Sequence, residues 1–159
     1  MLLPGEFSVG CIGDVATGLT LVLPRGRYEE SMLITHATGS PYAIFLAGQH
    51  QFTSFKCSGN DSWSGVLIPN ASIEVDESSI FDVRDTRTPL GALVREHTQL
   101  SLVTRTDAGF WGSVKTPLIG GLPPCRQDMA AGFTNWRIFL GEGTTKRELK
   151  RVEIKGSAD

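Results

Sequence analysis

A chain of 159 residues with 40% hydrophobic and 20% charged side chains is typical of an ordinary globular protein, and we expect one β-rich domain over residues 1–159. The formal net charge of -2 argues against a nucleic-acid partner, which needs a large basic excess on the protein. The longest apolar run, residues 18–23, is far shorter than the ~20 residues of a membrane helix, and the chain start lacks the basic segment of a signal peptide, so no membrane partner is expected.

The cysteines Cys11, Cys57 and Cys125 are an odd set, and their spacing is not that of a disulfide framework or a metal motif. Widely separated, unpaired thiols are typical of proteins in a reducing compartment. We therefore expect an intracellular protein of bacterial type, located in the cytoplasm.

From the N-terminus onward, the sequence predicts a succession of short strands. Runs rich in Val, Ile, Phe, Tyr and Thr are separated by clusters of Gly, Pro, Asn, Asp and Ser, which favour turns. The predicted strands cover residues 7–12, 18–23, 27–36, 42–47, 50–57, 65–68, 72–76, 80–83, 99–105, 110–115 and 134–140.

The hairpin around Gly48-Gln49 is predicted in more detail. Glycine at the first position suits a two-residue type II′ turn, which requires a positive φ there. This turn pairs Phe45 with Phe52 across the hairpin. It places on the other face the side chains of Ile44, Leu46 and Phe55, joined by Met32 and Ile34 of the preceding strand if its loop closes about Gly39. The resulting meander is expected to be apolar on both faces, as in sandwiches, barrels and helix-covered layers.

Helical signals are few. Thr88-Pro89 fits an N-cap and first-turn pair, with apolar residues at helical spacing up to His97. Residues 124–132 have room for one or two turns, and Thr145–Glu148 fits a capping box, although a final strand over residues 148–155 fits nearly as well. We expect a mainly β fold, an antiparallel β-barrel or β-sandwich with one or two short helices.

Metal and cofactor sites are not indicated. The expected registers place His36 and His50 at opposite edges of the meander, roughly 20 Å apart, where they cannot share a metal. Acidic residues gather in sequence at Glu74, Asp76, Glu77, Asp82 and Asp85, but they match no calcium loop and alternate as in any solvated strand. Phosphate-binding glycine loops and nucleophile elbows are absent from the sequence. We therefore expect no metal and no cofactor.

One enzymatic alternative stays open at Cys125. This residue follows a Gly-Gly-Leu-Pro-Pro segment and precedes Arg126, whose positive charge would stabilise a thiolate. If the fold brought a base such as His97 beside it, Cys125 would be the nucleophile of a cysteine-dependent enzyme.

The segment Asn60-Asp-Ser-Trp-Ser-Gly65 fits the pattern D/N-x-S-x-x-G. This pattern resembles part of the signature of PilZ domains, which are small β-barrels that bind cyclic di-GMP. The resemblance implies that Asn60, Ser62 and Gly65 contact a cyclic dinucleotide. The family also has an R-x-x-x-R arm upstream, where this chain has Arg25 and Arg27 at a different spacing, and the resemblance implies that these two replace the arm.

The tryptophans divide into two kinds. Trp63 and Trp111 have small, turn-forming neighbours, and tryptophans exposed near turns stack on rings or anchor protein partners. Trp136 is expected in the core, because Ile138 and Leu140 share its face. The predicted ligand-binding residues are therefore Asn60, Ser62, Trp63, Gly65 and Trp111.

Since the constellations of common catalytic chemistries are absent, the sequence indicates a non-catalytic binding or assembly module of unknown ligand. The apolar content exceeds what one sheet face hides, so Phe45, Phe52 and Trp63 are expected to cover a protein partner or a second subunit. We therefore expect self-association, while a small-molecule ligand stays compatible with the pattern. A cyclic-dinucleotide-binding β-barrel and a cysteine-dependent enzyme are the alternatives.

Overall fold

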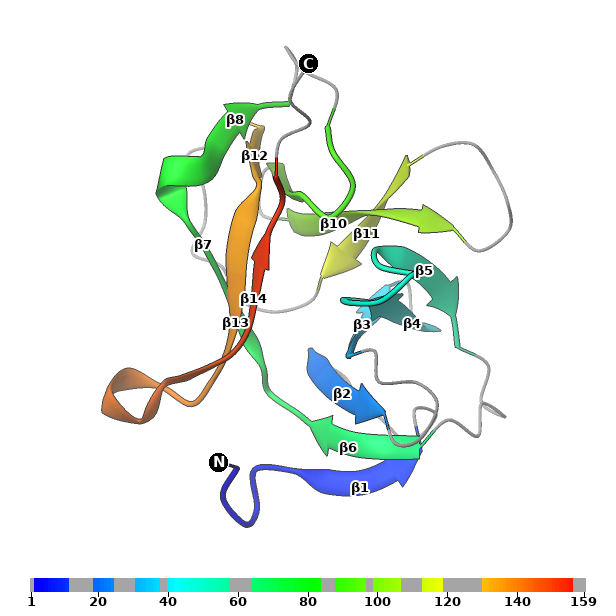
Figure 1. Cartoon of the computed structure of the whole chain (residues 1–159), viewed down its shortest axis with the longest axis vertical. Coiled ribbons are helices and arrows are strands. Elements are labelled where there is room, and N and C mark those ends of the chain that lie inside the picture. The colour runs from blue at the N-terminus through cyan, green and yellow to red at the C-terminus, as the bar shows by residue number, and fades with distance from the viewer. Residues whose placement is uncertain are drawn as a thin grey trace.

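The computed structural model describes residues 2–11, 19–24, 31–37, 40–57, 64–83, 88–96, 99–106, 113–118 and 130–155. Within these ranges nearly all regular structure is β-strand, arranged in two sheets (Figure 1), which confirms the predicted mainly β fold. Helical structure in the same ranges consists of two 3-10 turns, η2 (Glu77–Ser79) and η3 (Gly143–Thr145). No helix of the described residues is long and apolar enough to cross a membrane.

The larger sheet contains strands from the whole length of the chain. In spatial order its main path is β1 (Ser8–Cys11), β6 (Ser64–Ile68), β2 (Thr20–Pro24), β3 (Met32–Ala37), β4 (Ser40–Phe45), β5 (Thr53–Lys56), β10 (Gln99–Thr106), β9 (Leu93–Glu96), β12 (Ala131–Phe133) and β8 (Ile80–Asp82). Strand β11 (Ser113–Leu118) pairs with β10 off this path. All these pairings are antiparallel except that of β5 with β10, and the described strands do not close into a barrel.

The long strand β10 joins three neighbours. Strand β11 pairs with it along Leu100–Arg105, while its opposite edge is divided between β9 and the start of β5. A buried chain of hydroxyl groups lies at this junction: Thr104 is hydrogen-bonded to Ser54 at 2.9 Å and to Thr116 at 2.9 Å. The Ser54 hydroxyl also donates to the Arg105 carbonyl oxygen at 3.2 Å. Each of these polar groups therefore has a partner, as burial requires.

The smaller sheet has the order β14 (Arg147–Glu153), β13 (Asn135–Leu140) and β7 (Ser72–Val75). Along β13, Trp136, Ile138 and Leu140 are buried and their neighbours are half-buried, which confirms the predicted alternation. The Trp136 indole N–H donates to the Gly91 carbonyl oxygen, in the turn before β9, at 2.8 Å. This bond ties the smaller sheet to the larger one.

Two apolar clusters hold the fold together. The main core lies between the sheets and includes Leu33 and Ile44 from one sheet and Trp136 from the other. A second cluster lies on the opposite face of the larger sheet, and it contains Val22, Ile34, Ala43, Phe45, Cys57 and Leu67, with Phe55 packed against them. Successive strand residues point to opposite faces, so the two clusters confirm the expected meander with two apolar faces.

The predicted hairpin register is wrong by one residue. In the structure Ile44 pairs with Ser54, and the connection between β4 and β5 includes Phe52 at a φ of 60°. The Phe52 N–H still donates to the Phe45 carbonyl oxygen at 2.8 Å, but Phe52 packs in the main core and Phe45 in the second cluster. The Phe55 ring lies 5.5 Å from the Phe45 ring between centroids and does not share the face of Ile44. Ile34 also lies on the face opposite to Ile44, because Ile44 pairs with Leu33. The additional residue reverses the faces because side chains alternate along a strand.

The longer helices predicted in the described ranges are also wrong. Residues Leu93–Glu96 form β9, in which Leu93 and Val94 are both buried, so the apolar run belongs to a strand covered on two faces. The predicted helix at Thr145–Glu148 is replaced by the single turn η3, and β14 follows it, so the strand alternative is correct for this segment. Of the turns predicted within residues 124–132, residues 124–129 lie outside the described ranges, and β12 begins at Ala131.

Candidate functional site

Strand β1 is an edge of the larger sheet and differs in composition from the other edge strands. Within the described part of the chain, the strands paired on one side only are β1, β7, β8, β11 and β14. Proteins protect such edges with charged side chains, prolines or bulges. Four of these strands carry such protection, namely Glu74 in β7, Asp82 in β8, Lys115 and Pro117 in β11, and five charged residues in β14. Strand β1 reads Ser-Val-Gly-Cys and has none.

An apolar row crosses the sheet from β1. Val9 pairs with Val66 of β6, and Val66 pairs with Leu23 of β2, so these three side chains lie on one face. Val9 is 58% exposed and Leu23 is 39% exposed. Val66 packs against the main core, so the row continues the core-facing surface of the sheet to its margin. We refer to Val9, Val66 and Leu23 as the β1 row. Figure 1 shows β1 and β6 at the outer margin of the molecule.

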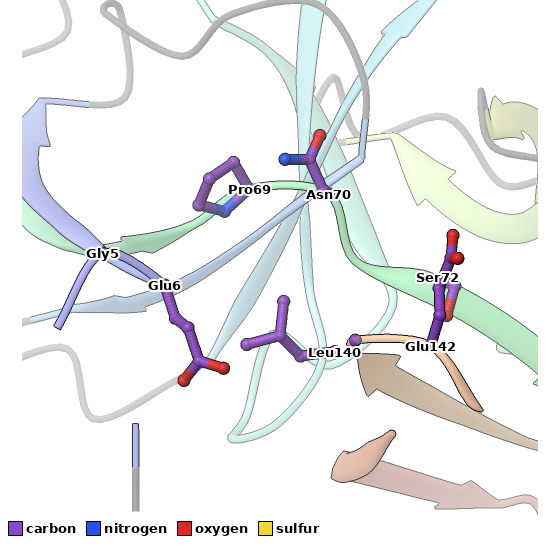
Figure 2. A pocket seen from close by; sticks show the side chains of 8 residues that line it. Gly5, Glu6, Pro69, Asn70, Ser72, Leu140 and Glu142 are labelled. Carbon is purple, nitrogen blue, oxygen red and sulfur yellow. The ribbon is translucent and has the colours of Figure 1, made fainter. Parts of the chain in front are cut away.

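A cleft of about 370 Å³ lies beside the start of β1. Three segments line it: the residues before β1, the link from β6 to β7, and the end of β13. Its lining consists of Gly5, Glu6, Pro69, Asn70, Ser72, Leu140, Gly141 and Glu142. Figure 2 shows Glu6 and Glu142 on opposite sides of Leu140. The backbone of Asn70 is left-handed, with a φ of 58°, a conformation that asparagine tolerates better than most residues.

Glu6 fastens the N-terminal segment to the smaller sheet. Its carboxylate accepts a hydrogen bond from the Leu3 N–H at 2.6 Å and forms an ion pair with the Arg147 guanidinium of β14. The Leu3 hydrogen bond, and then the bond from Arg147, lower the pKa of Glu6 below its ordinary value. The cleft therefore has an ionised, partnered carboxylate on this side. Among the described residues, its lining contains no histidine, lysine or cysteine.

The predicted acidic group has structural partners. Asp76 caps η2 by accepting hydrogen bonds from the Ser78 N–H at 3.0 Å and the Ser78 hydroxyl at 2.6 Å, and these bonds lower its pKa. Glu74 forms an ion pair with Lys146. Among the described side chains, no three histidine, cysteine, aspartate or glutamate residues are grouped so that they could hold a metal ion.

A smaller hollow of about 140 Å³ lies on β13 and β14. Its arginines are occupied by neighbouring carboxylates: Arg151 binds Glu148 through two hydrogen bonds of 3.0 Å, and Arg137 lies 3.7 Å from the same carboxylate. These bonds from Arg151 lower the pKa of Glu148. In this hollow the described arginine and carboxylate charges therefore offset each other.

The structure places some of the predicted site residues. Gly65 is buried in β6, between Gly10 of β1 and Pro24 of β2, which suits a residue where strands approach closely. Asn60, Ser62, Trp63 and Trp111 lie outside the described residues, as do Arg25, Arg27, His97, Asp85 and Cys125. Their predicted roles stay predictions.

Other predicted residues have clear positions. His36 pairs with Pro41 at one end of β4, and His50 is exposed in the turn that follows the other end. Cys11 and Cys57 are not joined in a disulfide, and they are half-buried and buried respectively. Phe45 and Phe52 are only 7% and 8% exposed, so the prediction that they cover a partner is wrong. The chain itself buries them on the two faces of the sheet.

Comparison with known proteins identifies relatives. The family model described as uncharacterised protein y4lG matches residues 12–159. A relative from Sinorhizobium fredii (strain NBRC 101917 / NGR234), itself described as uncharacterised protein y4lG, is 42% identical over 149 residues, which cover 94% of this chain and 91% of the relative. No solved structure matches the chain.

Proposed function

The chain belongs to the family of the uncharacterised protein y4lG, and we propose that it is a non-catalytic binding or assembly module that binds protein along β1. The family match begins at residue 12, just after β1, so this role is proposed for the present chain and not for the whole family. One observation carries it: among the described strands β1 is an edge strand without charge or proline, and Val9 and Leu23 of the β1 row are exposed.

Strand addition is the mode of binding that suits this edge. An extended segment of a partner can pair with the edge of β1 that none of the described strands occupies, while its side chains cover the β1 row. Large exposed apolar side chains at an interaction surface supply binding energy when a partner removes them from water. Val9 and Leu23 are available for this, whereas Phe45 and Phe52 are not.

A non-catalytic role is supported by the carboxyl groups of the described residues. General acids at neutral pH need a pKa raised toward the working pH. Three of the described carboxyl groups, Glu6, Asp76 and Glu148, instead have pKa values shifted downward by hydrogen bonds. Each is also held by a structural partner. A cytoplasmic location is proposed with this role, because Cys11 and Cys57 are not joined in a disulfide, which suits a reducing compartment.

The test combines light scattering with binding of the hydrophobic dye bis-ANS. Val9→Lys disrupts the β1 row, and Val114→Lys is the matched control, because Val114 is a 40% exposed valine on the charged edge strand β11. We expect Val9→Lys, but not Val114→Lys, to reduce either self-association or dye binding. A monomeric wild-type protein whose dye binding is unaffected by Val9→Lys would contradict the proposal.

The two alternatives from the sequence have separate tests. A PilZ-like role predicts heat on calorimetric titration with cyclic di-GMP, and its absence ends that alternative. A cysteine-dependent enzyme predicts unusually fast alkylation of Cys125 at pH 7. An ordinary rate ends the second alternative.

A further inference from the structure

We propose that the partner strand on β1 is β1 of a second copy, paired antiparallel about a two-fold axis at Val9. This inference rests on the proposed binding role of β1. It adds the identity of the partner and the register of the pairing.

The absence of charge makes β1 suited to its own copy. In a two-fold pair residue i lies opposite residue j and j opposite i, and only the residue at the axis lies opposite its own copy, so a charged residue at the axis would meet a like charge. Strand β14 carries a charge at five of its seven positions, whereas Ser-Val-Gly-Cys brings no charges together in any register. An uncharged edge also lacks the charge pattern with which an interface selects an unlike partner.

The β1 row selects the register. An axis at Val9 places Val9 opposite Val9 of the second copy, and both side chains then point to the same face of a continuous sheet. The row of one copy continues into the row of the other, in the order Leu23, Val66, Val9, then Val9, Val66 and Leu23 of the second copy. An axis at Gly10 would instead set two glycines opposite each other and interrupt the row.

The flanking charges do not oppose this arrangement. Glu6 lies three positions before Val9, so the two Glu6 residues lie six positions apart along the paired strands, on opposite sides of the axis. At about 3.3 Å per residue their backbones are roughly 20 Å apart, which exceeds the screening length of about 8 Å at physiological ionic strength. Arg147 further neutralises each Glu6.

The short length of β1 limits the affinity expected between two copies. Within β1, the register at Val9 pairs only Ser8, Val9 and Gly10 of each copy, and interfaces of this small kind are weak and transient. We therefore expect a monomer–dimer equilibrium that shifts with protein concentration.

The experiment combines sedimentation velocity with disulfide trapping in the full chain. In a Cys11→Ser background, Val9→Cys places two thiols opposite each other at a Cα separation of about 4.5–5.5 Å, which is within disulfide range. Val114→Cys in the same background is the control, and Cys57 and Cys125 are present in both variants. We expect disulfide-linked dimers with Val9→Cys only, and a dimer dissociation constant raised about tenfold or more by Val9→Lys.

The outcomes separate the two proposals. A wild-type protein that stays monomeric, while Val9→Lys still lowers its dye binding, overturns the second-copy partner and leaves the binding role of β1 standing. A dimer that Val9→Lys does not weaken overturns both, because association then uses another surface. A dimer weakened by Val9→Lys but not trapped by Val9→Cys overturns the register at Val9.

Discussion

Trp136 and Gly91 connect the two sheets through a single buried hydrogen bond of 2.8 Å, donated by the indole N–H to the backbone carbonyl oxygen. Trp136 is fully buried on β13, and Gly91 is buried in the turn that leads into β9. The bond therefore joins the middle of the smaller sheet to the junction in the larger sheet.

Trp136→Phe should destabilise the protein by about 1–3 kcal/mol, because the Gly91 carbonyl loses its donor while buried. The free energy of unfolding, measured by urea denaturation, checks this. Leu140→Met, on the same face of β13, is the packing control and should cost less. Equal losses for the two variants would mean that the hydrogen bond contributes little.

Gly91→Ala should lower the free energy of unfolding by more than backbone strain alone would. Gly91 has a φ of 82°, and an added Cβ would also overlap the ring of Phe52. Gly5→Ala is the control, since Gly5 has a φ of 92° and open space around its missing Cβ. We expect a loss of about 1 kcal/mol from backbone strain in the control and a clearly larger loss at Gly91. Similar losses would show that Phe52 moves aside without cost.

The hydrogen-bonded hydroxyl groups of Ser54, Thr104 and Thr116 at the β10 junction should contribute to stability jointly. Thr104→Val leaves Ser54 and Thr116 without their shared partner, and we expect a loss of about 1–3 kcal/mol in the free energy of unfolding. In the Thr104→Val variant, Thr116→Val should lower the free energy of unfolding by less than it does in the wild type, because it removes a hydroxyl group that has already lost its partner. Additive losses in the double-mutant cycle would count against a coupled network.

Stability should depend on pH through Glu6. Hydrogen bonds from Leu3 and Arg147 hold the folded-state pKa of Glu6 below its ordinary value of 4.5. A depressed carboxyl pKa stabilises the folded state above the unfolded-state pKa, and this stabilisation is lost as pH falls through the folded-state pKa. Glu6→Gln should therefore lower the urea midpoint at pH 7, and the difference from wild type should shrink below about pH 4.5.

The control for Glu6 is Glu142→Gln across the same cleft, because the described part of the structure gives the Glu142 carboxylate no hydrogen-bonding partner. Its urea midpoint at pH 7 should match that of the wild type. If the two substitutions lower the midpoint equally, the bonds of Glu6 to Leu3 and Arg147 do not fasten the N-terminal segment.

Local residue patterns predicted most strands but not how they are combined. The alternation of Trp136, Ile138 and Leu140 identified β13 and its buried face. The hairpin register failed because Phe52 adopts a positive φ, which only tertiary packing in the main core makes tolerable for a bulky residue. The sequence around Leu93 and Val94 predicts a helix wrongly, because an apolar run buried on both faces has no strand periodicity that distinguishes it from a buried helix.

The candidate site could not be predicted because it depends on distant pairings. Whether β1 is an edge is decided by β6, which lies between β1 and β2 although it follows both in the chain. The exposure of Val9 and Leu23 follows from this order and not from their own sequence context. The missing charge in Ser8–Cys11 is a visible signal, but it has meaning only once the strand is known to be an edge.

Hydrogen–deuterium exchange of the wild-type chain at increasing protein concentration tests the role of β1 most directly. Backbone amides on the free edge of β1 gain hydrogen bonds only when another strand pairs with them. We predict that exchange in a peptide covering Ser8–Cys11 slows as concentration rises, while peptides from β11 and β14 stay unchanged. Exchange in β1 that does not vary over a concentration range in which the protein dimerises would contradict pairing along this strand.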